Sequence, residues 1–336
     1  MKIRLTAVAA LTALAGLAHA QSSVTVFGMM DVSVKSVTNG NARVVQMSTD
    51  GLANSRLGFR AEEDLGGGMK AGAWLEAALN PDSGSINASG KFWHRRSTVS
   101  LSGGWGELRL GRDLNPSFWN LAIFDAFGTC GVGSGFNLAT NLGSGATTLL
   151  RTDNAVAYLL PSGLGGLYGH FMMAPDEGVA GNKYKGARLG YQSGPLNVAA
   201  SLATTGTATA DDFKVMNAGI SYDLKAVKLF ALTQSAKYGA RKQVNWEVGV
   251  TAPVGASGLV RASYQRSNAS GAGTDANDAR QAAIGYVHNL SVRTSLYATA
   301  SHLSNSGAAA FAVGTPPAGV ADSSSRGYEV GVRHAF

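Results

Sequence analysis

The chain is poor in several features that mark soluble domains and helical membrane proteins. Its 336 residues include one cysteine and 8 prolines, and only 15% are charged. A single cysteine excludes an intrachain disulfide, and soluble domains typically carry ~25% charged residues. Outside the N-terminus, no stretch approaches the ~18 continuous apolar residues of a membrane-spanning helix. We interpret Cys130, in a glycine-rich stretch, as a packed residue rather than a reactive one.

The N-terminal residues have the pattern of a secretory signal. A basic start at residues 1–4 precedes an apolar run over residues 5–18, and Ala18-His19-Ala20 is a small-x-small cleavage site. A transmembrane helix is the alternative, but the run is shorter than the ~20 residues needed to span a bilayer. We therefore expect cleavage after Ala20, with residues 1–20 as signal and residues 21–336 as one domain.

The last nine residues alternate in character. One parity is mostly apolar and the other is polar or small; the apolar parity holds Tyr328, Val330, Val332, His334 and Phe336. In an extended strand successive side chains point to opposite faces, so this segment has one apolar face with an aromatic ring at each end. A final strand of a soluble β domain and a lipid-facing strand of an outer-membrane barrel both fit. The export signal favours the barrel.

The same alternation recurs along the chain in about sixteen segments of roughly ten residues, the length of tilted membrane strands. Short turns alternate with longer loops, which we place at 36–54, 114–150, 268–278 and 304–325. This rhythm predicts an all-β fold: a sixteen-stranded antiparallel transmembrane β-barrel with both termini on the short-turn side. A soluble sandwich or propeller does not easily explain the charge-poor apolar parity.

If the apolar parity faces lipid, the charged parity faces a water-filled interior. The interior-facing residues of the first strands are Arg56, Arg60, Glu62, Lys70, Glu76 and Arg96. A charge facing lipid at mid-membrane would cost ~2–4 kcal/mol, which is why parity decides these positions. Strict parity points Arg112 outward, so it reaches the interior only if its strand bends or ends near Gly111.

The longest loop, 114–150, is rich in aromatic residues near its start. It contains a single acid, Asp125, and no basic residue before Arg151. Structureless loops of this length are uncommon and are usually functional or disordered, and the aromatics argue against disorder. We expect this loop to fold inward and narrow the pore.

Several short stretches together resemble the Gram-negative general diffusion porins, of the beta-proteobacterial type. They are spread over the chain beyond the signal: Ser23-Val-Thr-Val-Phe-Gly28, Ser55-Arg-Leu-Gly-Phe-Arg60, Glu63-Asp-Leu-Gly-Gly-Gly-Met-Lys70, Leu110-Gly-Arg112, Phe124-Asp-Ala-Phe-Gly128 and Gly331-Val-Arg-His-Ala-Phe336. The resemblance implies a sixteen-stranded barrel, a homotrimer, and a third extracellular loop folded into the pore.

The resemblance also implies site residues. A ladder of wall arginines opposes acids on the third loop; Arg56, Arg112 and Arg151 occupy the ladder positions and Asp125 lies in the loop motif. Arg60 and Arg96 are further candidates for the constriction, with pairing to nearby acids as the alternative. Phe336 is the expected mark for the barrel-assembly machinery, and outer-membrane lipids and lipopolysaccharide are the expected surroundings.

These observations predict a passive channel for small hydrophilic solutes and ions in the outer membrane. Three or more arginines against one aspartate predict an anion preference. A substrate-specific porin for small anionic solutes and a non-channel structural or adhesive barrel are the alternatives. We expect no enzyme, cofactor or metal site, because the histidines are scattered and no pair has metal-ligand spacing. Nucleic-acid binding is not expected, since the basic residues are spread over alternating strands.

Overall fold

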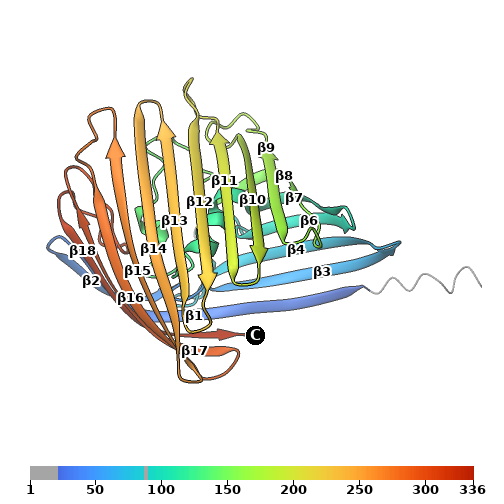
Figure 1. The fold of residues 1–336 in the computed structure, drawn as a ribbon, viewed down its shortest axis with the longest axis horizontal. Coiled ribbons are helices and arrows are strands. Elements are labelled where there is room, and N and C mark those ends of the chain that lie inside the picture. Colours follow the sequence, from blue (N-terminus) through green and yellow to red (C-terminus); the bar gives the residue numbers. More distant parts are fainter. Residues whose placement is uncertain (1–21, 87–89) are drawn as a thin grey trace, which may run out of the picture.

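The computed structural model describes residues 22–86 and 90–336, which form antiparallel strands around one short α-helix (Figure 1). The predicted signal lies outside the described residues. The strands are β1 (Ser23–Asn39), β2 (Ala42–Thr49), β3 (Arg56–Gly66), β4 (Met69–Asn80), β5 (Ser85–Ile86), β6 (Arg96–Gly103), β7 (Gly106–Leu114), β8 (Arg151–Leu159), β9 (Leu167–Ala174), β10 (Tyr184–Ser193), β11 (Leu196–Thr205), β12 (Phe213–Asp223), β13 (Lys228–Tyr238), β14 (Arg241–Val254), β15 (Gly258–Ser270), β16 (Ala279–Asn289), β17 (Thr294–Asn305) and β18 (Ser324–Ala335). No helix among the described residues is long and apolar enough to cross a membrane.

The strands close into a ring of sixteen positions, as predicted. Each strand pairs antiparallel with its neighbours, and β18 pairs with β1 to complete the ring. The long strand β1 pairs with β3 through its first half and with β2 through its second half, so β2 and β3 together fill one position. The short β5 pairs with the end of β4.

The prediction of a loop over 36–54 was wrong. Strand β1 continues to Asn39, and β2 returns from Ala42 after a two-residue turn at Gly40 and Asn41. Polar residues such as Thr38 and Asn39 occupy both parities here, so the alternation of apolar and polar residues is not visible in the sequence. Irregular backbone is confined to residues 50–55, where the Asp31 carboxylate accepts hydrogen bonds from the backbone N–H groups of Leu52 and Ala53 at 2.8 and 2.7 Å.

The apolar parity lies on the outer surface of the ring. Val24, Met216 and Val330 are 72%, 62% and 65% exposed, whereas the alternate residues beside them on β12 and β18, such as Asn217 and Glu329, are buried toward the interior. Large apolar side chains exposed in this way would be unfavourable in water, but they suit a hydrocarbon surrounding. The alternation that predicted the strands therefore also assigns their two faces.

Tight turns join the strands at one end of the barrel, and most of the longer loops lie at the other (Figure 1). In the turn after β3, Gly66, Gly67 and Gly68 all have positive φ, a conformation in which a Cβ is disfavoured. Both ends of the described chain lie at the short-turn end, where Phe336 and Gly28 exchange two backbone hydrogen bonds of 3.1 Å.

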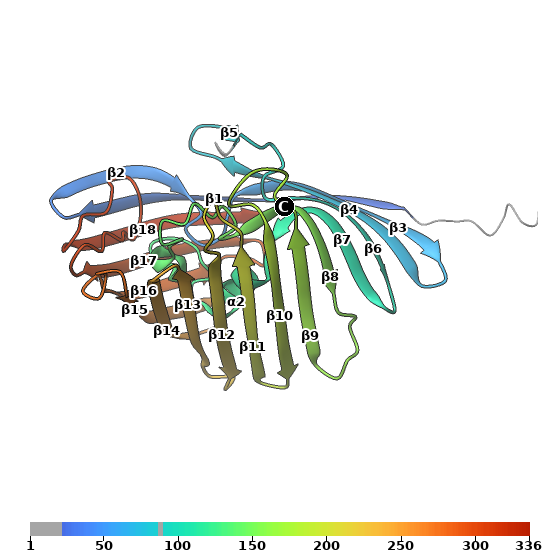
Figure 2. The same cartoon turned by 90° about the horizontal axis from the view of Figure 1, so that it is seen from above.

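The segment 115–150 between β7 and β8 places its helix against β9 to β13, the strands that follow β8 in the ring (Figure 2). It contains helix α2 (Pro116–Phe124) and a 3-10 turn at Gly135–Leu138. Asn115 caps the helix by accepting a hydrogen bond from Phe118 N–H, and Pro116 suits the first helical turn because its missing N–H is not needed there. We call residues 115–150 the inner segment.

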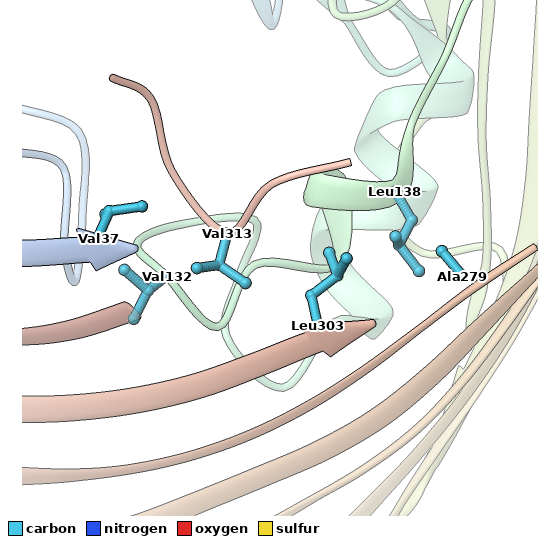
Figure 3. Packing of buried hydrophobic residues seen from close by; sticks show 6 residues of the cluster. All are labelled: Val37, Val132, Leu138, Ala279, Leu303 and Val313. Atoms are coloured by element: carbon cyan, nitrogen blue, oxygen red, sulfur yellow. The ribbon is translucent and has the colours of Figure 1, made fainter. Parts of the chain in front are cut away.

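At and just before the 3-10 turn, the inner segment shares a small apolar core with strand ends and with the loop after β17 (Figure 3). This cluster consists of Val37, Val132, Leu138, Ala279, Leu303 and Val313. Its residues come from β1, β16, β17 and two loops, so it joins the inner segment to the ring seam. Burial of each of its Val and Leu side chains contributes ~1.5–3 kcal/mol.

Candidate functional site

Helix α2 packs its buried face on the inner wall formed by β9 to β13. Phe124 is fully buried, and its ring lies over Gly219 of β12, where a Cβ would come within 2.2 Å of it. Asn120 donates to Asn217 Oδ1 at 2.8 Å, and Asn217 donates back to Ser117 O at 2.9 Å. A glycine and paired amides therefore let the helix lie close against the wall.

Amide side chains of the wall hold the rest of the inner segment. Gln243 and Asn245 of β14 both donate to Leu138 O, at 2.7 and 3.0 Å. Gln265 of β15 and Gln281 of β16 both donate to Ser134 O, each at 3.2 Å. Because a buried carbonyl without a partner is costly, these contacts select one position for the segment.

Asp125 is buried within the inner segment rather than exposed on its surface. It is 4% exposed, and its carboxylate accepts from the backbone N–H groups of Phe127, Thr129 and Gly135 at 2.7 to 2.8 Å. This arrangement is typical of an aspartate that orders a turn. The nearby Cys130 is buried, and burial raises the pKa of its thiol to about 12, which suits a packed residue.

Across the ring from the helix, arginines gather around one carboxylate. Arg95 Nε lies 2.5 Å from Glu76 Oε1, and Arg56 Nε lies 3.8 Å from the same oxygen. Arg151 Nε donates to the Arg95 carbonyl at 2.8 Å. Strand β3, which carries Arg56, and strand β12, beneath the helix, are half the ring apart. We call Arg56, Arg95 and Arg151 the arginine cluster.

Two further residues border the arginine cluster. Arg112 donates to the His94 carbonyl at 2.5 Å and to Asp153 Oδ1 at 2.6 Å. Burial, and then the guanidinium groups of Arg151, Arg95 and Arg112, lower the pKa of His94 to about 4. The imidazole is therefore neutral at pH 7, and the guanidinium groups supply the positive charge.

A β-bulge lies beside Arg112. Pairing between β7 and β8 shifts register between Gly111 and Asp113, and Gly111 has a φ of +125°. A bulge re-aims side chains, and glycine adopts such a φ without a Cβ clash. The strand is therefore irregular near Gly111, while Arg112 stays directly opposite Ser97 of β6, and its place in the lumen stays a prediction.

Arg60 and Arg96 lie next to the arginine cluster, toward the short-turn end of the barrel. They come from β3 and β6, on either side of Trp74 in β4. The Arg96 guanidinium lies 4.2 Å and that of Arg60 5.7 Å from the ring centroid, within range of cation–π attraction. Arg96 also lies 3.7 Å from Asp113. The charge of Arg96 is thus partly neutralised, whereas Glu76 is the single carboxylate paired with the arginine cluster, through Arg56 and Arg95.

Sequence reasoning missed Arg95. Parity counted back from β6 places it on the outer face, but β6 begins only at Arg96, and residue 95 is still in the loop. Its backbone N–H donates to Glu76 O at 3.1 Å, which turns the side chain toward Glu76. The Arg95-Arg96 doublet at a predicted strand end was the available signal.

A family model described as Gram-negative porin matches residues 7–308. The chain belongs to the Gram-negative porin family. Outer membrane porin protein 32 of Delftia acidovorans is 41% identical over the full length of both chains, and an outer membrane porin of Bordetella pertussis is 30% identical over the full length of both. The chain is therefore a porin, a β-barrel channel of the Gram-negative outer membrane.

Solved structures agree with this assignment. The anion-selective porin from Comamonas acidovorans has a TM-score of 0.87 and 37% identity, covering 94% of this chain and 100% of its own. The trimer form of OmpT from Vibrio cholerae has a TM-score of 0.70 at 15% identity, covering 94% of this chain and 99% of its own. The second likeness shows the fold alone.

Proposed function

We propose that this porin is a passive, anion-preferring channel for small hydrophilic solutes, in which the inner segment narrows the lumen opposite the arginine cluster. The observation that carries the proposal is the pairing of Arg56 and Arg95 with the single carboxylate of Glu76, with Arg151 bonded to the Arg95 carbonyl beside them. Positive groups lining a narrow pore with low-dielectric walls favour anions, since the walls focus the field. The anion-selective porin of Comamonas supports the same preference.

The proposed constriction consists of the arginine cluster, with Arg112 beside it. Asp125 has a structural role in this proposal, because its carboxylate is occupied by three backbone N–H groups. Arg60 and Arg96 form a further step along the same wall, next to Trp74. Transport in this scheme is diffusion, and no bond is made or broken.

Reversal potentials in a KCl gradient across a planar bilayer test the anion preference. We expect the wild-type porin to favour chloride and R56Q/R151Q to lose most of that preference. R293Q, which removes an arginine in the exposed turn between β16 and β17, should leave selectivity unchanged. Cation preference in the wild-type protein, or unchanged selectivity in R56Q/R151Q, would contradict the proposal.

The assembly proposed for this porin is a homotrimer, as in the trimer form of OmpT. Conductance rising in three equal steps as single assemblies insert would support it, and single steps would contradict it.

Phe336 is proposed to act in assembly rather than in conduction. It lies at the ring seam beside Gly28, with its ring half exposed on the outer face. Deleting Phe336 should therefore lower the amount of porin in the outer membrane without changing the selectivity of the channels that do insert. Normal membrane levels of the deletion variant would argue against this role.

A further inference from the structure

Lysines stand side by side on the outer face of the barrel, at the end where most of the longer loops lie. In the strand register, Lys214 of β12 is directly opposite Lys237 of β13, and Lys237 is directly opposite Lys242 of β14. Thr204 continues the same line from Lys214 to Lys185 of β10. We call Lys185, Lys214, Lys237 and Lys242 the lysine row.

All four lysines are exposed and share the parity of the apolar outer surface, as the neighbours Met216 and Trp246 show. Directly opposed side chains on one face have Cβ atoms ~4.5–5.5 Å apart, and like charges at such positions are destabilising. Among the described residues, no carboxylate lies within 4.0 Å of any lysine in the row. By contrast, Arg266 of β15, also on the outer face, lies 3.7 Å from Asp278.

An apolar groove lies on the same strands, next to the lysine row on its membrane side. Its volume is about 460 Å³. The first row of its lining lies two residues from the lysine row, toward the middle of the strands, and includes Ala187, Leu202, Met216 and Ser235. The next row includes Ala200 and Ala218. The groove is lined mainly by small residues, with the larger side chains of Leu189, Leu202 and Met216 among them.

The position of both features in the membrane follows from the family. In outer-membrane barrels the longer loops are extracellular, so the lysine row lies at the outer boundary of the apolar band. Lysines are common at such a boundary because their side chains can extend into the polar headgroup region. That does not explain why lysines on neighbouring strands stand directly opposite one another. An anionic group between the lysines removes the repulsion.

We propose that the lysine row and the groove form a binding site for a phosphorylated, acylated glycolipid of the outer leaflet, the lipid A part of lipopolysaccharide. The lysines bind its phosphate groups, and an acyl chain occupies the groove. Charge complementarity and the continuity of the row with an apolar groove select a lipid over a free anion. The site lies on the outer face and is independent of the arginine cluster.

Titration of the detergent-solubilised porin with bisphosphorylated lipid A, followed by native mass spectrometry, tests the site. Each lysine near a charged lipid surface contributes about a fivefold change in binding. K237Q, at the centre of the row, should bind roughly fivefold more weakly, and K214Q/K237Q/K242Q on the order of a hundredfold more weakly. K225Q, which removes an exposed lysine at the opposite end of the barrel, is the matched control.

Further measurements test the lysine row and the groove separately. Lipid A without phosphates should bind weakly to the wild-type porin and equally to K237Q. A200L, which fills the groove, should weaken binding of lipid A while leaving all lysines in place. Unchanged reversal potentials in each variant show that the barrel is folded, since selectivity is set in the lumen.

Several results would overturn the proposal. They are equal binding of lipid A by the triple variant and the wild type, equal loss in K225Q, and full competition by inorganic phosphate alone. A change of oligomeric state in the triple variant would overturn it as well, because the row would then contact a second copy of the chain.

Discussion

The two halves of the inner wall differ in the side chains they present. The half beneath the inner segment presents amides and glycine, such as Gln243, Gln265, Gln281 and Gly219. The opposite half presents the arginine cluster, Glu76 and further ion pairs. Neutral amides can be buried once they are hydrogen-bonded, whereas buried charges lose several kcal/mol of hydration each. Neutral amides of the wall therefore hold much of the inner segment, whereas the ion pairs gather on the opposite half.

The covered half also contains cations, and these lie against aromatic rings. Arg188 lies 4.6 Å from the centroid of Tyr168 and donates to Asn120 Oδ1 at 2.9 Å. Arg261 lies 4.5 Å from the centroid of Phe127. Guanidinium groups are weakly hydrated and stack well on rings, which is why arginine is found there. The same residue type thus packs against aromatic rings on one half, and on the other half it is proposed to line the pore.

Removing the main apolar contact of the covered half should have the largest effect. F124A empties a fully buried position above Gly219, and we expect the free energy of unfolding to fall by ~3–5 kcal/mol. The single-channel conductance should rise, because helix α2 loses its contact with β12. Urea unfolding in lipid vesicles and bilayer recordings measure the two effects. F171A, on the exposed outer face, is the control, and an equal loss in F171A would contradict the assignment.

Removing the amides that hold the inner segment should have a smaller effect. Q265A/Q281A removes both side-chain donors to Ser134 O and leaves only the 3.3 Å hydrogen bond from Asn137 N–H, and the two lost hydrogen bonds together contribute ~1–3 kcal/mol. The expected result is a lower free energy of unfolding and noisier open-channel current. The exposed Gln192 provides the control variant Q192A. Quiet channels of unchanged stability would show that the segment is held elsewhere.

The adjacent residues Arg95 and Arg96 distinguish the arginine cluster from its surroundings on the half opposite the inner segment. R95Q removes a member of the cluster, whereas R96Q removes a residue shared between Trp74 and Asp113. We expect R95Q to lower the chloride-to-potassium permeability ratio by roughly fivefold, which corresponds to about 1 kcal/mol of electrostatic free energy. R96Q should change it less. Reversal potentials measure both, and a larger effect of R96Q would move the constriction toward Trp74.

The smallest effect is expected from acidification. An ordinary histidine would gain charge as the pH falls from 7.5 to 5.5, but the pKa of His94 is lowered to about 4, so the imidazole stays neutral over this range. The wild-type porin and H94Q should therefore show the same pH dependence of reversal potential between pH 7.5 and 5.5. Anion preference that rises in the wild type alone would show that His94 titrates there. The free energy of unfolding, by contrast, does depend on pH through His94. The pKa of the folded state is below that of the unfolded state, so the stabilisation is fully present above pH ~6.5 and is lost as the pH falls toward 4.

The sequence by itself determined the barrel and the faces of most of its residues. A period of two leaves each side chain one of two directions, and the low charge of one parity identifies the lipid side, so Arg56, Arg60 and Arg96 could be placed on the interior from local pattern alone. The seam at Phe336 followed from the even number of strands. The extent of β1 and the existence of β2 were missed because polar residues occupy both parities there.

The tertiary structure alone decided the rest of the site. Period-two reasoning ends where a strand ends or bulges, so the inward position of Arg95 and the role of Gly111 beneath Arg112 depend on contacts with Glu76 and β8. The burial of Asp125 depends on how residues 125–135 turn back on its carboxylate. The lysine row arises in the same way, since residues up to 57 positions apart become neighbours only through strand register. Local pattern assigns a residue to a face, and pairing between distant segments decides which charges meet.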